Sequence, residues 1–391
     1  MKLYYYIRFS ENNIGGNLKF LAQINALEKL GIKSKCIFRT IEKSLIPGSL
    51  DIFQSNTEEI LSARTRFEII NRFSVYRKMF FSLKEKCQVC NKDDIIYIRM
   101  FFPTRYLYKA TTLKRNCKII LEHNTKEREE IFQLKKNYTR KCVFLLSDLL
   151  YSKKIRESVD AIVGVTPEIT NYQLTHYSVK NIPSISISNG FEVNSVPLRT
   201  IQPLHDEIHL LMVANVSYWH GIDRILKGLE KYNGKMRIIL HIVGNGKDID
   251  NLKRISSELK LENDIVFHGH LTGIQLDELY NICHIGVGSL GIHRKGLSQT
   301  SELKAREYCA RGLPYIIAVS DPDFPGTFPY IKLFPPDDSP LNIEKIIEFA
   351  EIIYTDPHHA EKMRDYAIKN LDWSVKMKQF KTFIEEEVLT L

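Results

Sequence analysis

The sequence has no long apolar run. Its longest apolar stretch, residues 142–146 extended by 149–151, is interrupted by Asp148 and falls well short of the roughly 20 residues that a membrane-spanning helix needs. Near the N-terminus the apolar residues 3–7 lie between Lys2 and Arg8, a run shorter than the apolar core of a secretory signal. We therefore expect a cytoplasmic protein with no membrane span.

Paired cysteines are also lacking. The seven cysteines are odd in number and scattered through 391 residues, which favours reduced thiols over a disulfide framework. Cys87 and Cys90 form a single C-x-x-C without a second pair, so chance spacing is favoured there over a zinc or redox site. The sequence shows no repeat, and its 44% apolar and 26% charged residues are typical of a globular chain of two or three domains.

Charge is distributed unevenly along the chain. Residues 1–200 carry 33 Lys and Arg against 19 Asp and Glu, a net charge of +14, whereas residues 201–391 carry 22 against 27, a net charge of −5. This asymmetry predicts an anionic partner for the first half: nucleic acid, anionic lipid or a phosphorylated substrate. Nucleic acid is not expected, because no RNP strand, zinc-finger spacing or helix-turn-helix pattern accompanies the charge.

Aromatic residues are interleaved with the basic ones in residues 64–81 and 135–156. Amphipathic helices of this kind suit an anionic membrane surface, which leaves a peripheral position at the inner face of the membrane open. The alternative is an ordinary solvated helix face over an aromatic stripe that faces the core. The sequence does not decide between the two.

Short β-rich runs alternate with helical patterns along the whole chain, which predicts parallel sheets with helical crossovers. A first series of strands ends near residue 188, and a second begins after Pro197 and Pro203. We therefore expect an α/β fold of two Rossmann-like, doubly wound domains, residues 1–200 and 201–391. Ligands of such sheets bind outside the carboxyl ends of the strands, so two facing domains would form a cleft.

Gly15 and Gly16 lie between the first predicted strand and the helix that follows it. Glycines at such a turn let backbone N–H groups approach a phosphate at the N-terminus of a helix. The spacing is not G-x-G-x-x-G, which excludes a dinucleotide fingerprint.

Three runs in the second half, residues 241–246, 264–269 and 302–314, resemble the donor-binding domain of glycosyltransferase family 4, also called glycosyl transferases group 1. Residues 15–16, 122–124, 161–166 and 188–190 support the resemblance in the first half. It implies a retaining enzyme of the GT-B architecture, with an acceptor-binding domain at 1–200 and a nucleotide-sugar-binding domain at 201–391. It also implies that the last helix packs back on the first domain.

The resemblance implies a role for Glu307, which matches the second glutamate of the family's E-x7-E motif and would hold the ribose hydroxyls. A carboxylate can accept two hydrogen bonds from a vicinal diol, so the residue type fits. The first glutamate of the motif is replaced by Gln299, which can still bond sugar hydroxyls but adds donors and loses the charge.

The family's diphosphate-binding Arg and Lys are replaced by Asn215 and His220, which are not fixed cations but can donate hydrogen bonds. Arg294, Lys295 and Lys304 are candidate replacements that would neutralise a leaving diphosphate. The alternative for Arg294 and Lys295 is a solvated basic loop.

The resemblance further implies that His123, with Glu122 as its rival, lies near the reacting sugar, and that Gly244, Gly269 and His270 lie by the nucleotide. No metal or other cofactor is expected, because no D-x-D stands in a suitable loop, and Asp321 and Asp323 have the sequence of a turn.

The expected partners are a nucleotide-diphosphate-sugar donor and a glycan or lipid-diphosphate-linked acceptor, in the synthesis of a surface polysaccharide or glycoconjugate. Two alternatives stay open: a non-catalytic nucleotide-binding subunit of the same fold, and a sugar-nucleotide epimerase.

Overall fold

The computed structural model describes residues 1–8, 14–40, 57–62, 68–132 and 138–390. The chain divides into two compact units, Met1–Ser188 with Trp373–Leu391, and Asn189–Asp372. The division thus precedes the expected boundary at residues 200 and 201. The reason is that the connecting segment is bonded into the second unit: the buried Arg199 donates hydrogen bonds to the carbonyl oxygens of Gly312 (2.9 Å) and Cys283 (2.7 Å).

The first unit is built on a seven-stranded parallel sheet in the order β3-β2-β1-β4-β5-β6-β7. The chain begins in the middle of this sheet and winds outward in both directions, as the doubly wound pattern predicts. The strands are β1 (Lys2–Arg8), β2 (Lys33–Thr40), β3 (Thr57–Ser62), β4 (Ile95–Arg99), β5 (Lys118–His123), β6 (Ala161–Gly164) and β7 (Ser184–Ser186).

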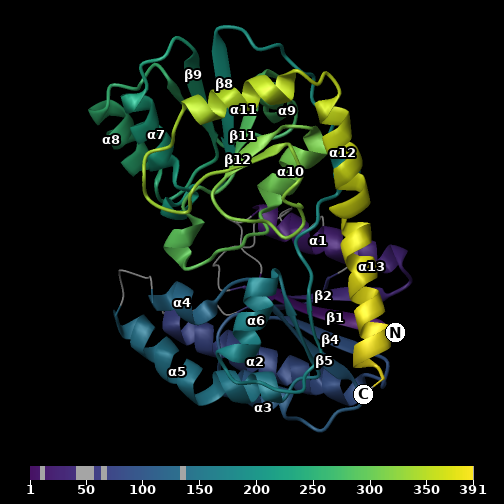
Figure 1. Ribbon diagram of the computed structural model, residues 1–391. Helices are drawn as coiled ribbons and strands as arrows, with labels where there is room; N and C mark the ends of the chain where they lie inside the picture. Colours follow the sequence, from purple (N-terminus) through teal and green to yellow (C-terminus); the bar gives the residue numbers. More distant parts are fainter. Residues whose placement is uncertain (9–13, 41–56, 63–67, 133–137, 391) are drawn as a thin grey trace. The chain divides into compact units, whose positions relative to one another are not determined.

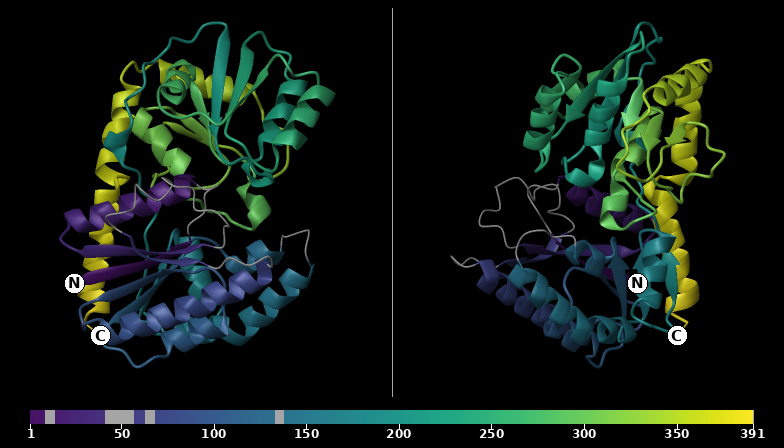
Figure 2. Two further views of the ribbon diagram at one scale, coloured as in Figure 1. Left: turned by 180° about the vertical axis from the view of Figure 1, so that it is seen from behind. Right: turned by 60° about the vertical axis from the view of Figure 1, so that its left-hand side comes forward.

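Helices cover both faces of this sheet (Figures 1 and 2). Successive residues of β1 point to opposite faces: Tyr5 meets Phe20 of one helical layer edge-on at 5.7 Å, and the Tyr6 hydroxyl meets Ser82 Oγ of the other at 3.0 Å. One layer holds α1 (Ile14–Lys29) and α13 (Trp373–Phe383), and the other holds α2 (Glu68–Val89), α3 (Arg105–Thr111) and α5 (Tyr138–Glu157). The shorter helices are α4 (Glu127–Phe132) and α6 (Pro167–Thr175).

The second unit repeats the same architecture on a six-stranded parallel sheet in the order β10-β9-β8-β11-β12-β13. Its strands are β8 (Glu207–Val213), β9 (Arg237–Val243), β10 (Ile265–Gly269), β11 (Ile285–Val287), β12 (Tyr315–Ile317) and β13 (Ile331–Leu333). Its helices are α7 (Ile222–Lys231), α8 (Ile249–Glu258), α9 (Ile274–Ile282), α10 (Leu303–Arg311), α11 (Glu344–Tyr354) and α12 (His359–Asn370).

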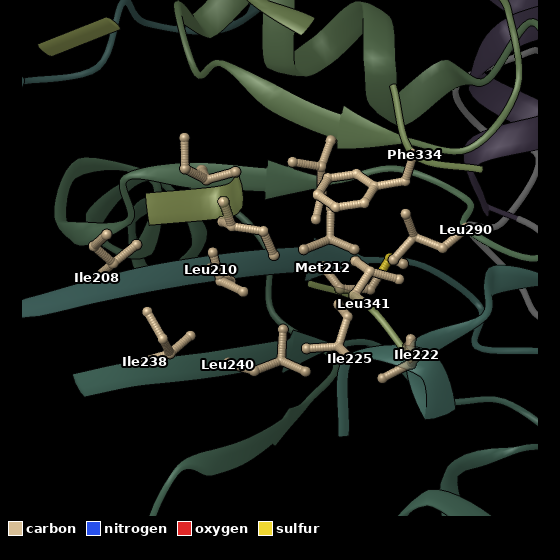
Figure 3. Close-up of a cluster of buried hydrophobic side chains, with 14 of the residues drawn as sticks. Ile208, Leu210, Met212, Ile222, Ile225, Ile238, Leu240, Leu290, Phe334 and Leu341 are labelled. Carbon is tan, nitrogen blue, oxygen red and sulfur yellow. The ribbon is translucent and has the colours of Figure 1, made fainter. Parts of the chain in front are cut away.

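Alternate residues of β8 separate the two cores of the second unit. Ile208, Leu210 and Met212 lie in a row against residues of β9 and α7 (Figure 3), in the larger core that also includes α11 and α12. Leu211 points to the opposite face and packs with residues of α9 and α10, including Tyr308. Because both faces are covered, the strands are apolar almost throughout, as is usual in parallel sheets.

None of the helices in the described ranges combines the length and the apolarity that crossing a bilayer requires. The seven cysteines are all free thiols, and Cys87 and Cys90 are buried in the core of the first unit.

Candidate active site

The loops at the carboxyl edge of the second sheet are tied to one another through their backbones. The Ala214 N–H donates to the Val243 carbonyl (3.0 Å), and the Gly244 N–H donates to the Gly269 carbonyl (2.5 Å). Gly244 has φ +111°, and a Cβ on it would overlap the carbonyl oxygen of Ala214. Glycine at this position is therefore required by the close approach of the loops that follow β8 and β9.

His220 lies where the loop after β8 meets the loop after β11. Its carbonyl accepts a hydrogen bond from the Leu290 N–H (2.8 Å), and a Cβ on the next residue, Gly221, would overlap the backbone of Gly291. The Ser217 N–H donates to His220 Nδ1 at 2.9 Å, so the ring proton resides on Nε2. His220 is thus a buried imidazole that presents an N–H donor.

The same imidazole stays neutral. Burial and the nearby ammonium groups of Lys304 and Lys295 hold the pKa of His220 well below its ordinary value of 6.5. The side chain therefore offers a phosphate oxygen a neutral donor and no charge of its own. Asn215, which is also expected to meet the diphosphate, is exposed in the loop just before His220.

Lys304 provides a cation close by. It lies in the first turn of α10, where its ammonium contacts Ser289 Oγ and Glu302 Oε2, both at 3.2 Å. The N-terminus of a helix carries a partial positive charge, which adds to that of the lysine. The loop after β11 and the start of α10 thus place a cation and helical N–H groups on the same side as His220.

Arg294 pairs with other residues of the protein. Its guanidinium pairs with both carboxylate oxygens of Asp223 (2.8 and 3.0 Å), with Asp338 (2.7 Å) and with the Tyr218 carbonyl (2.6 Å). These contacts join the loops after β8 and β11 and give Arg294 a bracing role. Lys295 lies over the ring of Trp219, with Nζ 5.0 Å from the ring centroid.

Glu307 lies one turn farther along α10 than Lys304. Its Oε1 accepts a hydrogen bond from Arg311 Nε (2.9 Å), and its side chain is 19% exposed. Burial raises the pKa of Glu307, although Arg311 opposes that shift. Gln299 pairs with Ser320 through an isolated parallel bridge just before α10. Gln299 and Glu307, the two residues expected to contact the donor, therefore lie before and after the start of α10.

Gly269 ends β10 with φ +68°, and the exposed His270 follows it. Next to them three imidazoles form a hydrogen-bonded row across the sheet. His209 Nδ1 lies 2.8 Å from His241 Nε2, and His241 Nδ1 lies 2.9 Å from His268 Nε2. Sequence reasoning missed this row because its members come from three different strands.

In the first unit, Glu122 at the end of β5 is a buried ion-pair partner. Lys19 contacts its Oε1 at 3.1 Å, and the Tyr5 hydroxyl donates to its Oε2. Although burial alone would raise it, Lys19 and Arg99 lower the pKa of Glu122 to about 2. This carboxylate is a poor proton acceptor at neutral pH.

His123 has a different environment. It is fully buried, its Nδ1 lies 2.6 Å from Glu127 Oε1, and its Nε2 has no hydrogen-bond partner among the described residues. Because a carboxylate only accepts, Glu127 fixes the ring proton on Nδ1 and leaves Nε2 as an acceptor. Burial lowers the pKa of His123 against the opposing effect of Glu127.

A further pair of side chains holds Glu127 in turn. Gln173 Nε2 donates to Glu127 Oε2 at 2.9 Å, and Arg156 donates to Gln173 Oε1 at 3.0 Å. Sequence reasoning did not identify Glu127, Gln173 or Arg156. The only local signal was a carboxylate four residues after His123. This carboxylate reaches the imidazole because the chain turns into α4 there.

Gly15 and Gly16 lie in the first turn of α1. Lys19 follows one turn later, and its ammonium contacts Asn124 Oδ1 at 3.0 Å as well as Glu122. The N-terminal half of α1 is thereby bonded to the end of β5. Burial lowers the pKa of Lys19 to about 8, although Glu122 opposes this shift.

Within the described ranges no group of three or more His, Cys, Asp and Glu side chains is arranged to hold a metal ion. The Asp321 and Asp323 carboxylates contact the buried Arg306, at 2.9 Å and 2.5 Å from its Nη2. This aspartate pair therefore braces α10.

Comparisons with known proteins agree with this architecture. Residues 199–322 match the family described as Glycosyl transferases group 1. An uncharacterized glycosyltransferase of Methanocaldococcus jannaschii is 25% identical over 353 residues, which cover 81% of this chain and 86% of that protein.

Solved structures with the same fold cover nearly the whole chain. A glycosyltransferase from Rickettsia africae has a TM-score of 0.66 at 16% identity and 98% coverage of both chains. Anabaena HepE in complex with UDP and glucose has a TM-score of 0.66 at 12% identity, with 98% of this chain and 99% of that one covered. The family match, the relative and the two Rossmann-like units together support a glycosyltransferase of the GT-B type.

Proposed function

We propose that the chain transfers a sugar from a nucleotide-diphosphate-sugar to a glycan or lipid-linked acceptor, with retention of configuration and without a metal ion. Such a reaction would serve the synthesis of a surface polysaccharide or glycoconjugate. The observation that carries the proposal is the donor set at the carboxyl edge of the second sheet: the neutral His220 N–H, the Lys304 ammonium and the start of α10.

This donor set suits a leaving diphosphate. As the glycosidic bond breaks, negative charge develops on the phosphate oxygens, and prearranged donors and cations that face them lower the barrier. His220 would donate from Nε2 without competing for the proton, because burial and two neighbouring ammonium groups keep it neutral. Lys304 and the N-terminus of α10 would supply the charge that a metal ion supplies in other enzymes.

Glu307 would bind the ribose. It lies one helical turn beyond Lys304, so a nucleotide whose diphosphate meets Lys304 extends its ribose along α10 toward the carboxylate. Uridine diphosphate is the first nucleotide to test, because HepE is seen with UDP-glucose and the pneumococcal O-GlcNAc transferase GtfA with UDP and GlcNAc.

Of His123 and Glu122, His123 is the better candidate for the residue near the reacting sugar. Glu127 is the residue that positions it. The His123 Nε2 is held as an acceptor, whereas Glu122 is already paired with Lys19. Retention would follow from attack on the same face from which the diphosphate leaves, with a phosphate oxygen taking the acceptor proton. No pair of carboxylates of the glycosidase kind is needed for this route.

Thermal unfolding tests the donor site directly. The intact protein would be heated with UDP, GDP, ADP and TDP and with their common sugars. At about 100 times the dissociation constant a bound ligand adds roughly 2.7 kcal/mol of stability, which is a clear rise in melting temperature. We expect one nucleotide to stabilise the native protein selectively and to lose this effect in Glu307→Ala.

The matched control is Glu258→Ala, which removes an exposed glutamate of α8 in the same unit. It should keep the full nucleotide response. If no nucleotide stabilises the native protein, or if both variants respond alike, the proposed donor site is wrong. With a responding donor in hand, NMR of the product anomer tests retention, and activity after extensive chelation tests the independence from metal.

A further inference from the structure

The helices α2, α3 and α5 form one layer over the first sheet, and their inward residues are ordinary core. Met79 and Leu83 of α2, Leu107 of α3 and Ile155 of α5 are all buried in the same cluster with the strands. Figures 1 and 2 show the three helices on one side of the sheet. The opposite side of each helix faces solvent.

The solvent side of α5 is apolar. Val143, Leu146, Leu149 and Leu150 are 55%, 60%, 76% and 45% exposed. Their spacing of three and four residues places them on one stripe of the helix. Phe81 on α2 adds a ring that is 52% exposed. Single exposed apolar residues are normal on soluble proteins, but four on one helical stripe mark a binding surface.

The rest of this layer is strongly basic. The exposed cations are Arg77, Lys78 and Lys84 of α2, Arg105 and Lys109 of α3, and Lys153 and Lys154 of α5. Among the side chains that the structure describes on these three helices, Glu85 and Glu157 are the exposed acids. The cations of this layer are complementary to lipid headgroups of negative charge. The apolar stripe is complementary to the acyl chains beneath those headgroups.

We infer that the α2–α3–α5 layer binds the surface of an anionic membrane, with Leu146 and Leu149 entering the headgroup region and the surrounding lysines and arginines contacting lipid phosphates. A second copy of the chain is the less suitable occupant, because a symmetric pairing through this layer would place like charges opposite one another. The inference rests on the proposed function only in one respect: a lipid-linked acceptor would then be met at the membrane where it resides.

Vesicle sedimentation with the full chain tests the inference. We expect the protein to sediment with vesicles of phosphatidylcholine that contain about 30–40% phosphatidylglycerol. The negative charge of such vesicles attracts a basic protein surface. Binding to pure phosphatidylcholine should be at least about tenfold weaker, and raising the salt concentration should weaken the anionic binding in the same way.

Two sets of variants separate the apolar and the charged contributions. The double variant Leu146→Glu/Leu149→Glu and the double variant Lys153→Glu/Lys154→Glu should each lower the apparent affinity for anionic vesicles at least about tenfold. The matched control is Ile352→Glu on α11, which belongs to the second unit and whose side chain is 68% exposed. It should bind as the native protein does. Circular dichroism and the melting temperature show that each variant is folded.

Vesicle binding by the leucine variant and by the native protein decides the inference. Binding that is unchanged in the leucine variant, or absent from anionic vesicles altogether, overturns the inference. A native dimer that becomes monomeric in the leucine variant while vesicles bind neither form assigns the stripe to a second copy, and also overturns it. The nucleotide response, measured on the same samples, separates the two proposals: vesicle binding without a nucleotide response leaves the docking surface standing and removes the proposed donor site.

Discussion

The carboxyl edges of the two sheets differ in the polar groups that they carry. In the first unit the polar groups there are buried and bonded within the protein: Lys19 pairs with Glu122, and the neutral His123 imidazole is hydrogen-bonded to Glu127. In the second unit the edge is built from glycine-bearing loops, a neutral imidazole and Lys304 at the start of a helix, whose ammonium also contacts Glu302 at 3.2 Å. Both edges therefore hold an ion pair, but the second also brings loop backbones close together and presents a neutral N–H donor, and these groups suit a highly charged ligand. The comparison thus favours the second edge as the diphosphate site.

The first way to test the comparison is to break the buried ion pair. Lys19→Met removes the cation that contacts the buried Glu122 carboxylate, and breaking a buried pair in this way costs about 3–5 kcal/mol of unfolding free energy. Urea unfolding of the variant and the native protein measures the loss. The control Arg254→Met breaks an exposed pair with Glu258 at 2.5 Å and should cost less than about 1 kcal/mol. Equal losses would contradict the description of the first edge.

The second test acts on the loops of the other edge. Gly246 has φ +154°, and a Cβ on it would overlap the backbone of Val216. We expect Gly246→Ala to cost about 2–4 kcal/mol, because both the conformation and the contact become strained. Gly326→Ala adds a methyl group with no heavy atom within 4 Å and should change stability by less than about 0.5 kcal/mol. A tolerated Gly246→Ala would show that the loops after β8 and β9 are not held as closely as described.

The third test concerns the positioning of His123. Removing the carboxylate in Glu127→Ala frees the imidazole to change tautomer, and kcat for sugar transfer should fall on the order of 10²-fold while KM for the donor stays unchanged. Glu127→Gln keeps an oxygen that can accept a hydrogen bond from the His123 Nδ1–H group and should recover part of the loss. Glu168→Ala, which removes the partner of Lys126 at 2.7 Å in the same unit, is the control. A rise in KM alone would assign Glu127 to substrate binding instead.

The fourth test uses pH. Burial, with His209 and His268 nearby, lowers the pKa of His241 to about 4, whereas an unfolded histidine titrates near 6.5. The folded state therefore binds fewer protons than the unfolded state, so this contribution to stability is present above about pH 6.5 and is lost as the pH falls toward 4. The expected loss is on the order of 2 kcal/mol. Urea unfolding at a series of pH values measures it, and His241→Phe should flatten the curve. A profile that the variant leaves unchanged would mean that the row does not set the pH dependence.

Much of the fold follows from the sequence because it depends on local patterns. Apolar runs such as residues 3–7 and 238–242 mark strands that are covered on both faces, and the alternation with helices predicts two parallel sheets. The segment 189–200 was harder to place. Its membership of the second unit depends on contacts such as Arg199 with Gly312, which are 113 residues apart.

The candidate site was less predictable for the same reason. The sequence shows that Arg294 is a cation in a glycine-bearing loop, but it does not show that Asp223, 71 residues earlier, occupies its guanidinium. Likewise, the pairing of Glu122 with Lys19 spans 103 residues. In the basic aromatic stretch of α2, Tyr76 stacks on Phe101 at 5.2 Å, as a core-facing aromatic stripe predicts, whereas Phe81 faces solvent, and its contact with a membrane stays a proposal. Residues 64–67 and 135–137 of those stretches lie outside the described residues.

The row of histidines in the second unit has a direction. His209 Nε2 lies 3.4 Å from a carboxylate oxygen of Glu207, which can only accept, so the proton of each ring in the row belongs on Nε2 and each Nδ1 accepts from the next ring. Reversing one ring would set two donors or two lone pairs against each other, so the three tautomers change together. An added proton can keep this order intact only on Nδ1 of His268, the ring nearest to Gly269 and the proposed nucleotide loop. The row would then respond to acid as a single group, and the added proton would bind at the ring beside the proposed nucleotide loop.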